Sequence, residues 1–409
     1  MSEKDLYSKL CVAESINFAV EGASDEVIDL TENDTFSCNL ATILARDKEV
    51  VAVRLKVLPD SCKVYISKNN NWLNEDVEYI NKIQGYLRNI SKDAPAKSKD
   101  VVKALTDDVM NYCSAKLESR FKRLKNDIIN GQNDEHIISF LKDTSTDVNN
   151  IDEVNKFKLS GICSKYNKKV KNDPTIPSRF LGHLRKVGSY AGSVINIMAC
   201  ARNIKYKILF SNIELYKMDP DIITNQSIFS WKNIIKRFAN DEEYELFMKK
   251  CLKNNFIKRK LIKIYTDENT KQLQLDNDIK QCIYLHAEMN ILTSIIDQDN
   301  RNREFIAVSK RCCYLCELYI DFARKQGYNI IISGKHKKIY CGWKLPHTAN
   351  IDFKNKSLEY ILENLDQIIE NKIKYYTGGV LADSDSYAGS VDSDNHSEAE
   401  EIYEILDEY

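Results

Sequence analysis

Two short motifs, whose first residues lie 27 positions apart, most constrain what this chain can fold into. His286-Ala287-Glu288 and Cys313-Tyr314-Leu315-Cys316 both lie near the starts of predicted helices, CIYLHAEMNILTSII (282–296) and CCYLCELYIDFARKQGY (312–328). The segment between them contains REFIAVSK, whose apolar and β-branched residues predict a strand. The sequence therefore predicts a helix–strand–helix unit with both motifs at helix starts.

The remainder of the C-terminal part continues this alternation. YNIIISG (328–334) predicts a second strand, and SLEYILENLDQIIENKIKYY (357–376) predicts a final amphipathic helix. Gly327 follows the preceding helix at the position where glycine commonly ends a helix. The order helix, strand, helix, strand, helix favours a sheet flanked by helices.

Farther upstream, the sequence predicts one hairpin and a long helical region. EVVAVRLKVL (49–58) and CKVYISK (62–68) alternate apolar and polar residues on either side of a Pro59-Asp60 turn, which predicts a β-hairpin. From residue 75 to about residue 280, apolar residues recur with helical spacing. The predicted helices are 75–90, 101–127, 134–142, 180–203, 228–239 and 241–253.

The net charge of −1 hides an uneven distribution of charge along the chain. Residues 378–409 hold ten acidic residues and no Lys or Arg, and this Ser-rich segment is predicted to be disordered. The preceding residues carry 59 basic against 50 acidic side chains, and 151–280 carry 25 against 14. A basic body fits an anionic partner such as a nucleotide or nucleic acid, and equally a solvated helical surface.

Two other classes of protein fit the sequence poorly. It has no run of about 18 apolar residues, the length that a membrane span requires. The first residues, MSEKDLYSKL, lack the apolar stretch of a secretory signal, so we expect a cytoplasmic or nuclear protein without a membrane partner. The twelve cysteines are then expected to be free rather than paired in disulfides.

The two motifs together have the residue types of a catalytic zinc site. Zinc prefers imidazole nitrogen and thiolate sulfur, and a catalytic site supplies three such ligands while leaving one position for water. Cys313 and Cys316 can share one face of a helix start, whose N–H groups stabilise a thiolate, and His286 supplies the third ligand. Glu288 is placed to carry protons beside a water molecule whose pKa the Zn²⁺ ion lowers.

Three other interpretations of these residues stay open. Cys341 could join the three ligands in a structural zinc site with four protein ligands, although this leaves Glu288 without a role. Cys312 and Cys316, four positions apart, form an alternative pair to Cys313 and Cys316. The cysteines could also be unrelated buried residues that bind no metal.

Three segments resemble the cytidine-deaminase superfamily and, within it, the OTT-like deaminase family of bacteria and fungi: HAEMNIL (286–292), FIAVSKRCCYLC (305–316) and SGKHKKIYCGWKLP (333–346). The resemblance implies a three-layer α/β/α core with a mixed five-stranded sheet, and a zinc site at the starts of two central helices. It also implies hydrolytic removal of an exocyclic amino group from a base. Cys312 departs from the family pattern, because it occupies the place of the usual proline.

In this family fold a hairpin precedes the helix that carries the histidine ligand, and 49–68 is the only good candidate in the sequence. The resemblance therefore implies a discontinuous domain. Its parts are 1–70, with the first helix and the hairpin, and 281–377, with the zinc ligands; a mainly helical, basic insertion (71–280) lies between them, and the acidic tail (378–409) follows. The alternative is a separate N-terminal domain with a hairpin of its own.

The resemblance also indicates residues for contact with a substrate. Asn69, at the end of the second hairpin strand, matches the family's substrate-contacting asparagine, although a run of three asparagines could simply form a turn. His336 and Trp343 could lie at the pocket rim, where an aromatic ring stacks on a base, or could serve packing alone.

Within the insertion, FLGHLRKVGSYAG (180–192) places His183, Arg185 and Lys186 before an apolar helix rich in small residues. A basic lip over the active site would suit a phosphate-bearing substrate. A helix buried on one face explains the same residues without any function. The sequence leaves both interpretations open.

Two functions of different classes are compatible with these observations. The first is a zinc-dependent hydrolytic deaminase acting on cytosine or adenine bases of a nucleotide or nucleic acid, with Glu288 as proton carrier. The second is a catalytically inactive, zinc-stabilised scaffold that binds nucleic acid or protein. An intact Glu288 favours the enzyme, because a purely structural zinc site has no use for a proton carrier.

Overall fold

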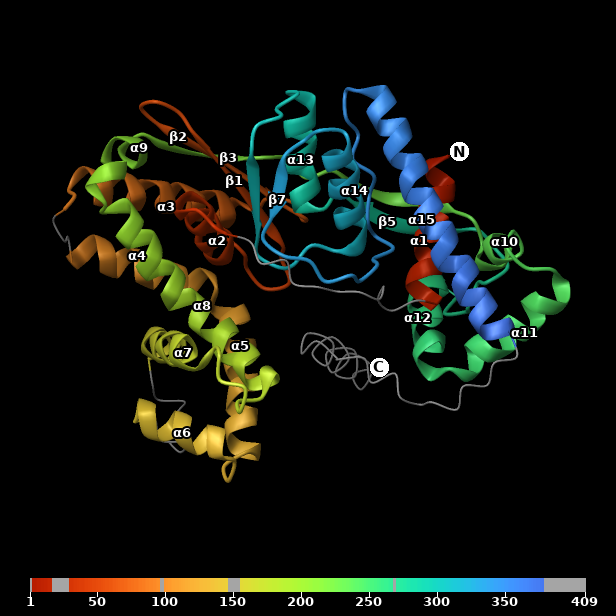
Figure 1. Cartoon of the computed structure of the whole chain (residues 1–409), viewed down its shortest axis with the longest axis horizontal. Helices are drawn as coiled ribbons and strands as arrows, with labels where there is room; N and C mark the ends of the chain where they lie inside the picture. Colours follow the sequence, from red (N-terminus) through yellow and green to blue (C-terminus); the bar gives the residue numbers. More distant parts are fainter. Residues whose placement is uncertain (1, 17–28, 96–98, 146–154, 268–269, 379–409) are drawn as a thin grey trace.

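A five-stranded mixed sheet joins distant parts of the chain, as the sequence predicts (Figure 1). Its strands are β1 (Val51–Val57), β2 (Cys62–Lys68), β3 (Ile213–Lys217), β6 (Glu304–Val308) and β7 (Ile330–Ile332), in the order β3-β2-β1-β6-β7. The computed structural model describes residues 2–16, 29–95, 99–145, 155–267 and 270–378. The predicted disordered tail, apart from Gly378, lies outside these described residues.

The pairing of the strands places the hairpin beside the segment that carries the metal-site motifs. β1 is antiparallel to both β2 and β6, whereas β3 is parallel to β2 and β7 is parallel to β6. β3 comes from the region that we predicted to be mainly helical. The division into 1–70, 71–280 and 281–377 stays a prediction, but the sheet takes strands from all three ranges.

The sheet separates two apolar cores, because successive side chains of a strand point to opposite faces. Val51 and Val53 of β1 pack with α2 (Glu32–Ile43) and α3 (Asn74–Lys92) on one face. Ala52 packs on the other face with α13 (Ala287–Asp297) and α14 (Tyr314–Lys325). All three β1 side chains are fully buried. The result is the expected three-layer α/β/α arrangement, with the two motif-bearing helices in one layer.

A second, two-stranded sheet corrects the prediction for the segment before His286. β4 (Ile222–Ile228) and β5 (Ile279–Tyr284) pair in antiparallel fashion. The helix predicted over 282–296 therefore starts too early, because β5 occupies its first residues and α13 begins after them. The pairing partner of β5 lies far upstream, so local periodicity could not reveal this strand.

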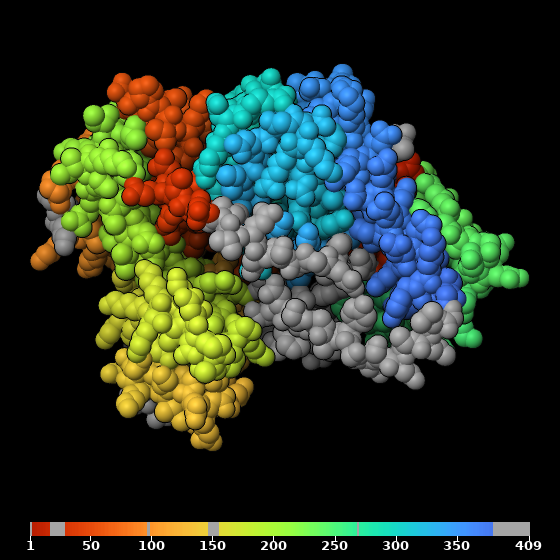
Figure 2. Space-filling view, in the orientation of Figure 1, coloured from red at the N-terminus to blue at the C-terminus, as the bar shows by residue number. Residues whose placement is uncertain are grey.

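Most of the remaining helices fall into two groups. α5, α6, α7 and the first part of α8 extend below the sheet in the view of Figures 1 and 2, where they form the gold and yellow lobe, whereas α4 and the end of α8 pack with α3 in the core on one sheet face. α1 and α10 to α12 gather around α15, so that α1 packs against α15 although they come from opposite ends of the chain (Figure 1). The bounds are α1 (Glu3–Ile16), α4 (Lys99–Tyr112), α5 (Ser114–Asn130), α6 (Glu135–Thr144), α7 (Lys156–Val170), α8 (Ser178–Ala201), α9 (Lys207–Ser211), α10 (Trp231–Ile235), α11 (Asp241–Lys253), α12 (Asn255–Tyr265) and α15 (Ile351–Thr377). None of the helices in the described ranges is both long and apolar enough to span a membrane.

Two of these helices are held unusually close together by a glycine. A Cβ atom at Gly188 of α8 would lie 2.5 Å from the backbone nitrogen of Ser164 in α7, so a side chain cannot fit there without a shift. Ser160 reinforces the contact, because its hydroxyl donates to the Val187 carbonyl at 2.7 Å and accepts the Ala191 N–H at 3.0 Å. These contacts fix the position of α8 within the lobe.

A buried ion pair ties the N-terminal hairpin to β6. The guanidinium of Arg54 on β1 donates to both carboxylate oxygens of Glu304 on β6, at 2.7 and 2.6 Å. The Arg54 side chain is only 1% exposed and that of Glu304 is 12% exposed. Paired geometry of this kind is specific to Arg and carboxylate, and it links two strands whose residues are 250 positions apart in the chain.

We predict that Arg54→Met destabilises the protein by roughly 3–5 kcal/mol, because it leaves the Glu304 carboxylate buried without its partner. The double variant Arg54→Met/Glu304→Met removes both charges and is expected to regain much of that loss. Guanidinium chloride unfolding of the three proteins measures the effect. An Arg54→Met variant as stable as the wild type would show that the pair does not hold the hairpin in place.

Candidate metal centre and active site

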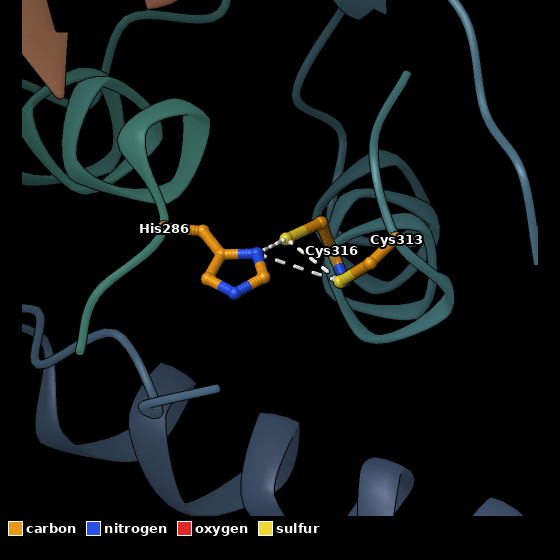
Figure 3. A group of neighbouring side chains, drawn as sticks. All are labelled: His286, Cys313 and Cys316. Atoms are coloured by element: carbon orange, nitrogen blue, oxygen red, sulfur yellow. Dashed lines mark hydrogen bonds between the residues drawn. The ribbon is translucent and has the colours of Figure 1, made fainter. Parts of the chain in front are cut away.

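Three donor atoms converge at the edge of the layer formed by α13 and α14 (Figure 3). The Nδ1 atom of His286 lies 3.5 Å from the Cys313 sulfur and 3.3 Å from the Cys316 sulfur. The two sulfur atoms are 3.4 Å apart. Tetrahedral zinc with ordinary bond lengths separates such ligand atoms by roughly 3.5–3.8 Å. The three side chains are thus nearly in place to hold one such ion.

The starts of two helices produce this convergence. His286 is the residue that precedes the first turn of α13, and Cys313 holds the equivalent position before α14. The Cys313 sulfur accepts the backbone N–H of Cys316 at 3.5 Å, as a capping side chain does. Both helices therefore direct the positive ends of their dipoles at the donor atoms, which favours thiolate.

The charges of the site also favour a metal-binding form of Cys313. Burial alone would raise the pKa of its thiol, but the Cys316 hydrogen bond and the His286 charge outweigh burial and hold the pKa well below its ordinary value. Burial tends to lower the pKa of His286, yet the negative charge and hydrogen bond of Cys313 raise it overall. These effects favour the thiolate form of Cys313, which is the form that binds metal.

Trp343 lies beneath the metal centre, which differs from our expectation that it would line the pocket rim. Its side chain is fully buried, and its indole N–H donates to the Cys316 sulfur at 3.3 Å. The backbone of Trp343 forms an isolated β-bridge with Tyr284 at the end of β5. This bridge holds the loop that contains Trp343 against β5. A ring in this position cannot stack on a base, but its N–H orients and stabilises a ligand sulfur.

Glu288 is buried in the first turn of α13 and is 2% exposed. Its Oε2 atom has no hydrogen-bond partner among the described residues. Burial raises the pKa of Glu288 above its ordinary value, although the His286 charge opposes this. A buried carboxyl group that the protein leaves unsatisfied costs free energy, and such groups are typical of catalytic acids and bases. The donor set and this carboxyl group together fit a zinc ion with a proton carrier beside it.

A cavity of about 510 Å³ adjoins the metal centre. From the residues singled out in the sequence, its lining includes His286, Glu288, Cys313, Asn69, His336, His183, Arg185 and Lys186. Cys316 and Trp343 do not line it. The structure therefore brings most of the predicted residues, from five separate parts of the chain, to one cavity.

Asn69 and His336 are both held by backbone contacts at the cavity. The Oδ1 atom of Asn69 accepts the Val50 N–H at 2.9 Å, which closes the open end of the hairpin. The N–H of His336 donates to the Cys312 carbonyl at 3.0 Å, and its ring nitrogen Nδ1 accepts the Lys338 N–H at 3.1 Å. These bonds give both residues a structural role, and their place in the lining leaves a contact with substrate as a prediction.

The two alternative cysteine ligands lie outside the donor cluster. Cys341 donates its N–H to Glu14 at 2.6 Å. Cys312 is buried and bonds through its backbone N–H to the Gly334 carbonyl at 2.9 Å. Within the described ranges, the cluster at this site consists of His286 and the pair Cys313 and Cys316.

Three basic residues of α5 line the cavity although the sequence did not indicate them as site residues, namely Lys116, Arg120 and Arg123. Their spacing of four and three positions places them on one face of α5. That spacing is visible in the sequence, but a basic stripe usually indicates a solvated face. Only the packing of α5 against the rest of the fold, which brings these residues to the cavity, distinguishes them from such a solvated face.

Comparison with known proteins gives one family. A family model described as OTT_1508-like deaminase matches residues 285–347, which include His286, Glu288, Cys313 and Cys316. No curated protein and no solved structure matches the chain significantly. The matched segment coincides with the part of the fold that supplies all three donor atoms. Residues 285–347 therefore resemble the OTT_1508-like deaminase family.

Proposed function

We propose that the protein is a zinc-dependent hydrolytic deaminase that acts on cytosine or adenine bases of a nucleotide or nucleic acid. The observation that carries this proposal is the three-ligand donor cluster at the wall of a cavity, with Glu288, whose Oε2 atom has no hydrogen-bond partner among the described residues, beside it. Three protein ligands leave one position for water, as in catalytic zinc sites. The match to a deaminase family supports the type of reaction.

In this proposal, Glu288 moves the protons. Zinc, when bound, supplies positive charge and lowers the pKa of a water molecule toward neutrality. Glu288 accepts one proton from the water as its oxygen bonds to C4 of cytosine or C6 of adenine, and it delivers this proton to the adjacent ring nitrogen, N3 of cytosine or N1 of adenine. Glu288 then carries the remaining proton of the new hydroxyl group to the exocyclic nitrogen. The carbon–nitrogen bond then breaks and ammonia leaves, while the water oxygen becomes the carbonyl oxygen of the product.

Other residues of the cavity would hold the base. We assign this role to Asn69 and His336, because both line the cavity and carry polar groups that can bond to a base edge. Tyr284 and Tyr340 also line it, and their rings offer surfaces on which a base can stack. The base would thus be held between the hairpin end and the loop that follows β7.

The rival function, an inactive zinc-stabilised scaffold, has less support. A structural zinc site has four protein ligands and no need of an open position. The cluster in the described residues has three, and it adjoins a cavity large enough for a small molecule. Burying Glu288 with its Oε2 atom unbonded also costs folding free energy, and an inactive scaffold would gain nothing from it.

The first prediction concerns the metal. We expect the purified protein to contain one zinc ion per chain, and Cys316→Ser to lose most of it, because a weakly basic hydroxyl replaces a thiolate ligand. Cys312→Ser and Cys341→Ser are matched controls that should retain the metal. Elemental analysis by mass spectrometry of the four proteins gives the stoichiometry. Loss of zinc from the Cys341→Ser protein would support the four-ligand structural site instead.

The second prediction concerns Glu288. Glu288→Gln should lower the rate of ammonia release by about 10²–10⁴-fold, because the amide cannot accept and return a proton. Its zinc content should equal that of the wild type. The assay first screens cytidine, adenosine, their monophosphates, single-stranded DNA and RNA for ammonia release by the wild type. Deamination by a zinc-loaded Glu288→Gln protein at the wild-type rate would rule out the assigned role of Glu288.

A further inference from the structure

Lys116 of α5 is a buried amine in the lining of the cavity that adjoins the metal centre. The residue is only 8% exposed. No carboxylate of the described residues lies within ion-pair distance of its Nζ atom. Charged groups are rarely buried without a partner, because removing a charge from water costs free energy. A charged group that is buried without a partner at the wall of a cavity marks a candidate functional site, and an anion is the ligand that would pair with an amine there.

The second cation of this wall is Arg120, one helical turn along α5. Its guanidinium is held by the Lys186 carbonyl at 3.0 Å and lies 5.1 Å from the ring centre of Tyr190. Neither contact neutralises its charge, and the described residues offer it no carboxylate partner. Because α8 supplies both contacts, Arg120 is fixed in direction before any ligand arrives, which lowers the entropy cost of binding.

Electrostatics indicate that these cations lie close enough to disfavour one another. Burial, followed by the charges of Arg120 and Lys310, lowers the pKa of Lys116 to about 7. Asp47 also faces the cavity, but its opposing effect on Lys116 is smaller than that of the two cations. An anion placed between these groups would relieve the repulsion and restore the charged form of the amine.

We propose that Lys116 and Arg120 form a phosphate subsite, and that the base deaminated at the metal centre is attached to a phosphate. This inference rests on the proposed function for the identity of the base, but the subsite stands on the contacts of α5 and α8. One cavity of about 510 Å³ reaches both the subsite and Glu288, and it has the size of a site for a small organic ligand. The 5′-phosphate of a mononucleotide and the backbone phosphate of a strand share this chemistry.

A purely structural role for Lys116 makes an opposite prediction for its replacement. If the amine only served packing or an internal hydrogen-bond network, Lys116→Met would destabilise the fold. If it serves a ligand, Lys116→Met keeps a side chain of similar length and removes an unpaired buried charge. We therefore expect the thermal midpoint of Lys116→Met to equal or exceed that of the parent protein. A clear fall in the midpoint would contradict the subsite.

Calorimetric titration measures ligand binding without dependence on turnover. The full chain carries Glu288→Gln, so that ligands are not consumed, and is titrated with cytidine, adenosine, CMP, AMP and a short single strand of DNA or RNA. We expect at least one phosphate-bearing ligand to bind tenfold or more tightly than its nucleoside. Lys116→Met should lower the affinity for that ligand by about 10- to 100-fold, which corresponds to the loss of one hydrogen bond to a charged group. The affinity for nucleosides should stay unchanged.

The matched control is Lys122→Met, the same substitution at an exposed lysine of the same helix that does not line the cavity. It should bind each ligand as the parent protein does. Tight binding of CMP or AMP would assign the subsite to a mononucleotide, and tight binding of strands alone would assign it to a backbone phosphate. Equal binding of nucleosides and phosphate-bearing ligands, or equal effects of Lys116→Met and Lys122→Met, would overturn the inference. If a ligand binds in a Lys116-dependent way but the wild-type protein releases no ammonia from it, the proposed deaminase activity is wrong and the phosphate subsite stands.

Discussion

The closeness of one imidazole nitrogen and two sulfur atoms, all within 3.5 Å of one another, is the constraint on which the account of this protein depends. It requires α13 and α14 to begin at neighbouring points, since His286 and Cys313 are the residues that precede their first turns. β6 lies between these helices in sequence and pairs with β1 in the sheet. The hairpin therefore helps to position the metal centre, although it contributes no donor atom to it.

The cavity beside the metal centre combines two different contributions. The layer of α13 and α14 supplies the donor atoms and Glu288, whereas α5 and α8 of the lobe supply cations. The lobe helices are fixed to each other by the Arg120 contact and by a hydrogen bond between His183 and Asp127. Further cations line the cavity from the part of the fold that carries the donor atoms, namely Lys48, Lys310, Arg311 and Lys338. A change in the lobe could alter which substrates bind without disturbing the donor atoms.

Local sequence patterns predicted those elements that short stretches of neighbouring residues specify. The hairpin, the helix starts and the donor residues have compact motifs, and the family resemblance supplied the five-stranded sheet. β3, β4 and β5 were missed, because short strands gain stability from partners that are distant in sequence. Trp343 was expected at the pocket rim and is buried instead, since a loop aromatic gives no sign of which way it points. Lys116 looked like any lysine of a solvated helix.

X-ray absorption at the zinc edge, on the purified full chain, tests the central claim most directly, because it counts the ligand atoms by type. The account predicts two sulfur atoms at about 2.3 Å and one imidazole nitrogen at about 2.0–2.1 Å, with one further light atom that the protein does not supply. A third sulfur atom in the shell would place Cys312 or Cys341 at the metal and leave no position for water. A shell without imidazole would contradict the assignment of His286.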